Sequence, residues 1–291
     1  MRLASVVAAA MLLIATTAHA ADTRAVLAVA RQRIETADFR ATGRLVRVDA
    51  GGNRISNAIT IKARWFPGVL RALVEIVPLR GQAGNARPDA RVSILLEMRP
   101  DGQNTIRIFR SHESAPASLP FDKWGESVFG SDFNYEDFLQ PEYYWQGQTI
   151  LKSARFGARD CDVLKSTPVA LDHSHYAEVQ TWLDHTIGYP VYVEKTLKDG
   201  GIVKEFTYFG LSRSGGVWSA RQVEVKIHGR PGSTLLIIER GSTKQISASG
   251  TSVPSRSANS RIAHDPSFRI FGCRCGVARR GIPLSTHRRQ S

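Results

Sequence analysis

Acidic and aromatic side chains gather in residues 130–147, GSDFNYEDFLQPEYYWQG, where they could carry out chemistry. This stretch holds a quarter of the chain's 24 Phe, Trp and Tyr residues, together with Asp132, Glu136, Asp137 and Glu142. Two carboxyl groups in one cleft, one of them with a raised pKa, can act as a general acid and a general base. A ring-rich segment can instead cover an apolar groove. The first interpretation describes an enzyme and the second a carrier.

The local pattern gives most of these acids a structural role. Asp132 is a good helix N-cap. Glu136 and Asp137 would then lie in the first turn, where carboxylates interact favourably with the helix dipole, and Pro141 would end the helix. Neither a nucleophile nor a third catalytic group accompanies the acids. We therefore predict that the protein is not an enzyme, and that this stretch is a short helix with an aromatic exit serving as a lid.

Other residue types that could do chemistry form no recognisable site. The sequence HSH at residues 173–175 could place two imidazoles on one strand face, but histidines beside turns are more often solvated loop residues. Cys161 lies in an alternating apolar pattern typical of a buried, unreactive thiol. Cys273 and Cys275 have no further ligands at zinc-site spacing. No Gly-x-Ser-x-Gly turn is present. We predict neither a metal nor a cofactor.

The N-terminus reads as a secretory signal peptide covering residues 1–20. Arg2 supplies the positive charge, the apolar run Val6–Ala15 follows, and Ala18-His19-Ala20 fits the small-x-small cleavage pattern. We expect cleavage after Ala20 and export to a bacterial periplasm. No later segment approaches the roughly 20 apolar residues that a membrane-spanning helix needs.

Residues 245–291 differ in composition from the rest of the chain. They contain eight Arg and one Asp but no Lys or Glu, so most of the formal net charge of +13 lies there. We predict a disordered Ser/Arg-rich tail, because the segment cannot bury enough apolar surface to offset its ordering entropy. It is either a basic arm or a translated alternative reading frame. For an exported protein we expect no nucleic-acid partner.

Residues 21–244 have the length and pattern of one sheet-rich domain. Asp22–Thr36 carries an apolar stripe and is the one long helix candidate. Alternating or apolar runs separated by Gly-rich turns indicate the strands. The expected strands are Ala41–Val48, Ala58–Trp65, Leu70–Val77, Arg91–Met98, Thr105–Arg110, Thr149–Phe156, Cys161–Ser166, His175–Asp184, Val191–Leu197, Ile202–Phe209, Val217–His228 and Thr234–Arg240.

Short connections make these strands antiparallel neighbours, and a sheet of this size curls or closes. The predicted fold class is mainly β: a curved antiparallel sheet of about 11 strands forming an incomplete barrel. One N-terminal helix and a short central helix would cover its concave face. Such a sheet can enclose an apolar ligand cavity.

Residues 128–138, VFGSDFNYEDF, resemble the GSDFSYEDL signature of the outer-membrane lipoprotein-sorting protein family, which is similar to the LolA-type carriers. The resemblance continues through Tyr176–Asp184, Gly188–Pro190 and Lys204–Phe206, and covers roughly residues 25–244. One departure is the aromatic–acidic closing motif that the family adds after the position of Lys244, which is missing here.

The resemblance implies a half-barrel whose cavity holds the acyl chains of a lipoprotein or another lipid, with no cofactor and no catalytic residues. We therefore expect a monomeric, non-enzymatic periplasmic carrier that moves its cargo toward the outer membrane. The alternative is a lipid- or lipoprotein-sensing accessory protein of a membrane transporter complex. The residues expected to line or cover the cavity are Trp65, Leu96, Met98, Phe133, Phe138, Tyr144, Trp145 and Trp182.

Overall fold

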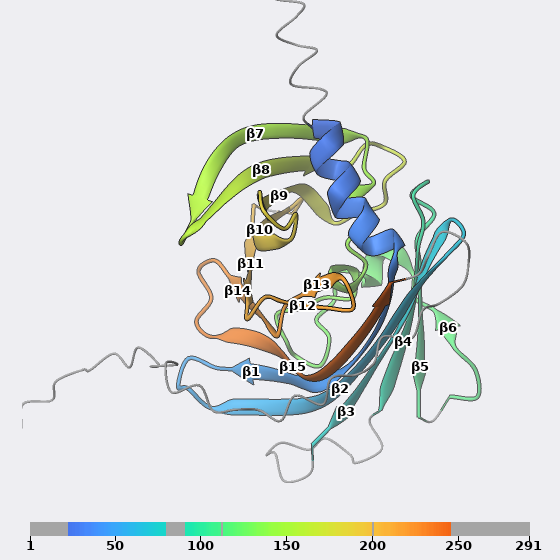
Figure 1. Ribbon diagram of the computed structural model, residues 1–291. Helices are drawn as coiled ribbons and strands as arrows, with labels where there is room; N and C mark the ends of the chain where they lie inside the picture. Colours follow the sequence, from blue (N-terminus) through green and yellow to red (C-terminus); the bar gives the residue numbers. More distant parts are fainter. Residues whose placement is uncertain (1–22, 80–90, 112, 200, 246–291) are drawn as a thin grey trace, which may run out of the picture. The chain divides into compact units, whose positions relative to one another are not determined.

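The computed structural model describes residues 23–79, 91–111, 113–199 and 201–245. These residues form one helix at the N-terminal end (residues 23–35), one large antiparallel sheet and a separate two-stranded hairpin. The sheet is curved and does not close on itself, which confirms the predicted incomplete barrel (Figure 1). The predicted signal peptide and nearly all of the predicted tail lie outside the described residues. Within the described ranges, no helix has the length and apolar character needed to cross a membrane.

The sheet contains 13 strands in the order β6-β5-β4-β3-β2-β1-β15-β14-β11-β10-β9-β8-β7, and β12 pairs with β13 in the hairpin. The strands are β1 (Ala37–Val48), β2 (Arg54–Phe66), β3 (Val69–Pro78), β4 (Val92–Met98), β5 (Thr105–Arg110), β6 (Ala117–Ser118), β7 (Gly147–Phe156), β8 (Arg159–Thr167), β9 (Tyr176–Asp184), β10 (Pro190–Leu197), β11 (Val203–Phe209), β12 (Ser212–Ser214), β13 (Val217–Ser219), β14 (Gln222–Ile227) and β15 (Ser233–Gln245). Every predicted strand is present. The run predicted as a single strand over Val217–His228 is divided between β13 and β14.

The strand order shows that the chain builds the sheet in two halves. The first half runs from β1 at the middle outward to β6 at one edge, and the second runs from β7 at the other edge back to β15, which pairs with β1. Residues 119–146 connect the two edges, and we call them the crossing segment. Because this segment must pass from one edge to the other, it lies across the concave face, together with the N-terminal helix (Figure 1).

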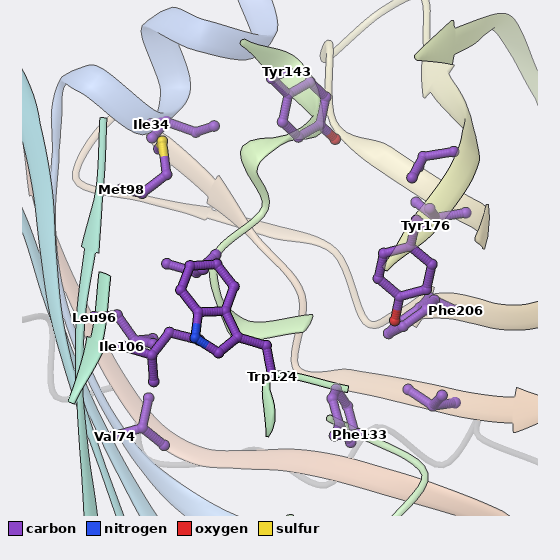
Figure 2. Close-up of a cluster of buried hydrophobic side chains, with 14 of the residues drawn as sticks. Ile34, Val74, Leu96, Met98, Ile106, Trp124, Phe133, Tyr143, Tyr176 and Phe206 are labelled. Carbon is purple, nitrogen blue, oxygen red and sulfur yellow. The ribbon is translucent and has the colours of Figure 1, made fainter. Parts of the chain in front are cut away.

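The hydrophobic core fills part of the space between the concave face, the helix and the crossing segment. Alternation along each strand turns one set of side chains inward. In β4, for example, Ile94, Leu96 and Met98 are all buried. They meet Ile34 of the helix and Trp124 of the crossing segment in one cluster (Figure 2). This part of the curved sheet thus has an apolar inner face.

The helical predictions have different outcomes. The N-terminal helix is confirmed over residues 23–35. The short central helix takes the form of two single-turn 3-10 helices, η2 (Glu136–Phe138) and η3 (Pro141–Tyr143). Between them Gln140 has a left-handed φ of 55°, which interrupts any longer helix. The predicted N-cap role of Asp132 is wrong, since Tyr135 precedes the first turn and the Asp132 side chain bonds elsewhere.

We predict that Gly43, at the bulge where β1 joins β15, tolerates no side chain. A Cβ atom there would lie 1.9 Å from the backbone oxygen of Ile237. Gly43→Ala should therefore force the two strands apart and lower the free energy of unfolding by about 1–3 kcal/mol. The matched control is Gly241→Ala on the facing strand, where the nearest atom to the new Cβ would be 3.5 Å away. Urea denaturation compares them, and equal midpoints for the two variants would contradict the prediction.

Candidate functional site

The crossing segment is tied to the rest of the chain by four buried acidic side chains, Asp132, Glu136, Asp137 and Glu142, each of which contacts a residue distant in sequence. Asp132 accepts a hydrogen bond from the hydroxyl of Thr234 in β15 (2.8 Å) and lies 3.3 Å from the guanidinium of Arg47 in β1. Its backbone N–H donates to the same hydroxyl oxygen at 2.9 Å. Asp132 therefore fastens the segment to the β1–β15 junction, where the two halves of the sheet meet.

Asp137 lies at the centre of a fully buried charge network. Its carboxylate is 2.9 Å from the ammonium of Lys204 and 3.7 Å from that of Lys195, and it accepts a hydrogen bond from the Tyr176 hydroxyl at 2.5 Å. Lys195 also pairs with Glu142, 3.4 Å away. Two carboxylates of the crossing segment thus match two lysines of β10 and β11, so that these four charges sum to zero.

The aromatic rings of the core complete the surroundings of the two lysines. The Lys195 ammonium lies 5.1 Å from the centre of the Tyr176 ring and 5.2 Å from that of Phe206. Burial alone would raise the pKa of Asp137, but the attraction of Lys204 and Lys195 outweighs it and holds that pKa below its ordinary value. Burial likewise opposes the charge on Lys195, but Glu142 and Asp137 raise its pKa overall. Both groups are therefore charged at neutral pH.

Glu136 connects the crossing segment to the start of β9. Its carboxylate accepts a short hydrogen bond from the Ser174 hydroxyl, and it lies 3.0 Å from the backbone nitrogen and 3.1 Å from the Nδ1 of His175. These four acids are thus structural anchors, although their partners are residues of the strands or of the loop before β9 and not a helix dipole. Among the described residues, no group of three or more His, Cys, Asp or Glu side chains could hold a metal. Cys161 is a free, fully buried thiol, as predicted.

A largely apolar cavity of about 260 Å³ lies between the concave face, the N-terminal helix, the crossing segment and the β12–β13 hairpin. Small side chains create part of the space, since Ala63 and Ala72 stand opposite each other on β2 and β3. Asp137 and Lys195 contribute a polar patch to its wall. The other lining residues are Arg33, Ile34, Phe39, Ile61, Leu70, Val74, Phe133, Phe138, Leu139, Gln140, Tyr189, Phe206, Tyr208, Val217, Trp218, Ser219, Ala220, Val223, Leu236 and Ile238.

The structure distributes the eight residues predicted to line or cover a cavity over several places. Phe133 and Phe138 line this cavity, and their rings stack with centroids 5.5 Å apart. The rings of Trp65 and Tyr144 stack on each other, with centroids 6.2 Å apart, so that β2 meets the end of the crossing segment. The remaining three on the concave side, Leu96, Met98 and Trp145, are buried in the core cluster.

Trp182 lies on the opposite face of the sheet. It pairs in register with Tyr192, and the neighbouring pair, Thr181 and Val193, is buried on the concave side. Because successive residues of a strand point to opposite faces, Trp182 points outward and packs edge-on against Tyr192. Contact of any of the eight residues with a ligand stays a prediction.

Several residues of the site were missed from the sequence, namely Arg33, Lys195 and Lys204. A signal for the two lysines exists in the strand pattern. Val191, Val193 and Lys195 are alternate residues of β10 and share one buried face, so a lysine stands at a position where the alternation calls for an apolar residue. In β11, Lys204 likewise stands at a buried position, on the same face as Phe206 two residues later. A buried lysine requires a carboxylate nearby, and the acid-rich segment supplies it.

We predict that Asp137→Asn destabilises the fold strongly. The change keeps the shape of the side chain and removes the charge that offsets Lys204 and part of Lys195. Breaking a buried pair in this way leaves an uncompensated charge and costs about 3–5 kcal/mol. Chemical denaturation measures the loss. The control, Glu126→Gln, removes an exposed partner of Lys123 and should leave the midpoint unchanged. Equal midpoints for both variants would show that the network contributes nothing.

The pH dependence of the stability difference between wild type and Asp137→Asn can also be predicted. The lowered pKa of Asp137 means that its contribution is complete above the ordinary aspartate value of about 4, and is lost as the pH falls through the lower folded value. The raised pKa of Lys195 means that its contribution is complete below about 10.4 and is lost as the pH rises further. The stability gap between wild type and Asp137→Asn should thus stay constant around neutral pH, and a gap that changes there would contradict this assignment.

Comparison with known proteins supports the fold. Residues 92–249, just over half of the chain, match the model of a protein family described as "-like: Uncharacterized protein". None of the curated proteins matches the sequence.

Solved structures resemble the chain more extensively. A putative outer membrane lipoprotein-sorting protein domain from Vibrio parahaemolyticus superposes with a TM-score of 0.64 at 20% identity, covering 75% of this chain and 91% of that one. A DUF1329 family protein from Desulfovibrio piger gives 0.64 at 14% identity, covering 76% and 92%. A LolA superfamily protein from Nitrosomonas europaea gives 0.56 at 12% identity, again covering 76% and 92%. The chain therefore belongs to the family matched by residues 92–249, and its fold is LolA-like.

Proposed function

We propose that the protein is a non-enzymatic carrier that holds the acyl chains of a lipoprotein or lipid in the cavity, and moves this cargo through the periplasm toward the outer membrane. The observation that carries the proposal is the largely apolar cavity between the concave sheet, the N-terminal helix and the crossing segment. The names of two solved neighbours, a lipoprotein-sorting domain and a LolA superfamily protein, agree with it. Export and the monomeric state belong to the same proposal.

The energetics of such a cavity suit an acyl chain. Burial of each CH₂ group contributes about 0.8 kcal/mol, so a chain binds without specific polar contacts. A cavity of about 150 Å³ is enough for one benzene molecule in a protein interior. The cavity of about 260 Å³ therefore accepts a longer apolar segment, and a whole acyl chain requires the cover to move.

The β12–β13 hairpin is the part of the cover suited to such movement. It forms a separate two-stranded sheet, and all three residues of β12 are exposed. Residues 217–220 of the same hairpin line the cavity. Displacing this hairpin would widen the cavity without breaking the hydrogen bonds of the large sheet.

The contacts of the acids in the crossing segment favour a structural role over a catalytic one. Asp132, Glu136, Asp137 and Glu142 each hold a partner on the sheet or a neighbouring loop. A hydrolytic pair would need one carboxyl group with a raised pKa, whereas the Asp137 pKa is lowered. The acids therefore support the cover of a binding cavity.

The direct test is to purify the full chain from a bacterial periplasm, extract it with organic solvent and identify bound lipid by mass spectrometry. We expect lipids or lipopeptides bearing long acyl chains in near-stoichiometric amount. Absence of such molecules, together with no uptake of a fluorescent fatty acid, would refute the carrier function. Recovery of a membrane transporter complex without any lipid would favour the accessory role instead.

We predict that Ala72→Phe reduces uptake of a fluorescent fatty acid at least tenfold, because the new ring fills the cavity beside Ala63. The matched control is Leu73→Phe, the next residue along the same strand, whose side chain points to the other face. Fluorescence titration compares the two variants, and circular dichroism checks that both fold. Undiminished uptake by Ala72→Phe would show that the ligand lies elsewhere.

A further inference from the structure

Arg33 lines the cavity, and two of its guanidinium nitrogens have no acceptor among the described residues. It lies on the N-terminal helix, seven residues after Val26 and three after the buried Ala30, so helical spacing places it on the apolar stripe. Its Nε and Nη2 atoms are buried and form no hydrogen bond. Arg33 also forms no ion pair with any residue in the described ranges. Lys195, a buried lysine of the same cavity wall, in contrast meets the carboxylates of Glu142 and Asp137.

The aromatic neighbours of Arg33 satisfy only the faces of its guanidinium group. The guanidinium carbon lies 4.9 Å from the centre of the Tyr189 ring and 5.9 Å from that of Tyr143. Such cation–π contacts stabilise the charge but accept no N–H hydrogen bond within the guanidinium plane.

Arg31, two residues earlier in the same helix, has a hydrogen-bond acceptor for its guanidinium group. Its Nε donates to the backbone oxygen of Tyr143 at 2.8 Å, and its guanidinium also lies over a ring, that of Tyr144. The helix and the crossing segment therefore offer acceptors to one arginine and none to the other. The difference indicates that the acceptor for Arg33 comes from outside the described residues.

The two unsatisfied nitrogens define the shape of that acceptor. Nε–H and Nη2–H point in parallel along one edge of the guanidinium group, the edge that binds both oxygens of a carboxylate or phosphate. Arg33 lines the cavity, but its Nε and Nη2 atoms are themselves covered, so a ligand in the cavity reaches this edge by displacing the side chains that cover it. The aromatic shielding would also strengthen such a pair by excluding water.

We propose that Arg33 binds an anionic two-oxygen headgroup, a carboxylate or a phosphate, of the amphiphile whose acyl chain occupies the cavity. This inference rests on the proposed carrier function and narrows it to anionic cargo. The apolar wall from β2 and β3 would contact the chain, and the arginine at the helix would hold the head.

Equilibrium dialysis of the delipidated full chain with three radiolabelled C16 probes tests the proposal: hexadecanoate, hexadecyl phosphate and hexadecan-1-ol. We expect the wild type to bind at least one anion about tenfold more tightly than the alcohol, as a charge-assisted bidentate pair provides. Comparison of the two anions distinguishes a carboxylate from a phosphate. Arg33→Gln should bind all three probes with the affinity of the alcohol. Arg33→Lys keeps the charge but loses the two parallel N–H donors, and should keep part of the preference for anions over the alcohol.

The control variant is Arg24→Gln, which removes an exposed charge from the same helix and should keep the full preference. Equal wild-type affinities for the alcohol and both anions, or a preference that persists in Arg33→Gln, would overturn the proposal. Binding of the alcohol without discrimination would refute the headgroup site and leave the carrier function standing, whereas failure of every probe to bind would contradict both. If Arg33→Gln does not fold, an undiminished preference in Arg33→Lys would overturn the bidentate site.

Discussion

The structure depends on one buried interaction, the pairing of the Asp137 carboxylate with the ammonium groups of Lys204 and Lys195. The chain forms the sheet from the middle to one edge and then from the other edge back to the middle. A segment of the chain must therefore pass from one edge of the sheet to the other. The crossing segment belongs to no strand of that sheet. Apolar burial alone is non-directional and would leave its position loosely defined. The charge pairs, together with the hydrogen bonds of Asp132 and Glu136, give it one position.

This constraint connects stability with the proposed binding site. Asp137 and Lys195 form part of the cavity wall, so the network that anchors the crossing segment also bounds the space beneath it. The large sheet supplies the opposite wall through Ala63 and Ala72. A carrier needs a cavity that persists when empty, and the anchored segment prevents the two sides from collapsing onto each other. The β12–β13 hairpin, which is not part of the large sheet, remains as the part of the cover that can move.

The sequence predicted the fold well because local physics determines its elements. Alternating or apolar runs identified the strands except β6 and β12, and Gly-rich turns placed the connections, as in β5, where Thr105–Arg110 agrees at both ends. The apolar stripe of the N-terminal helix was equally clear. The central helix was less well predicted, since Gln140 adopts a left-handed conformation that its residue type does not require. The resemblance of residues 128–138 to the lipoprotein-sorting signature indicated the LolA-like fold from the sequence alone.

What the sequence by itself determined is thus most of the strands, the N-terminal helix and the importance of the acid-rich segment. Only the tertiary structure decided which charges meet, because Asp137 and Lys204 are 67 positions apart and the curvature of the sheet brings them together. It also placed Trp182 on the outer face and Arg33 beside the cavity. Periodicity shows which side chains share one face of a helix or strand, but not which helices and strands face each other across the cavity. The site is formed by contacts between such elements.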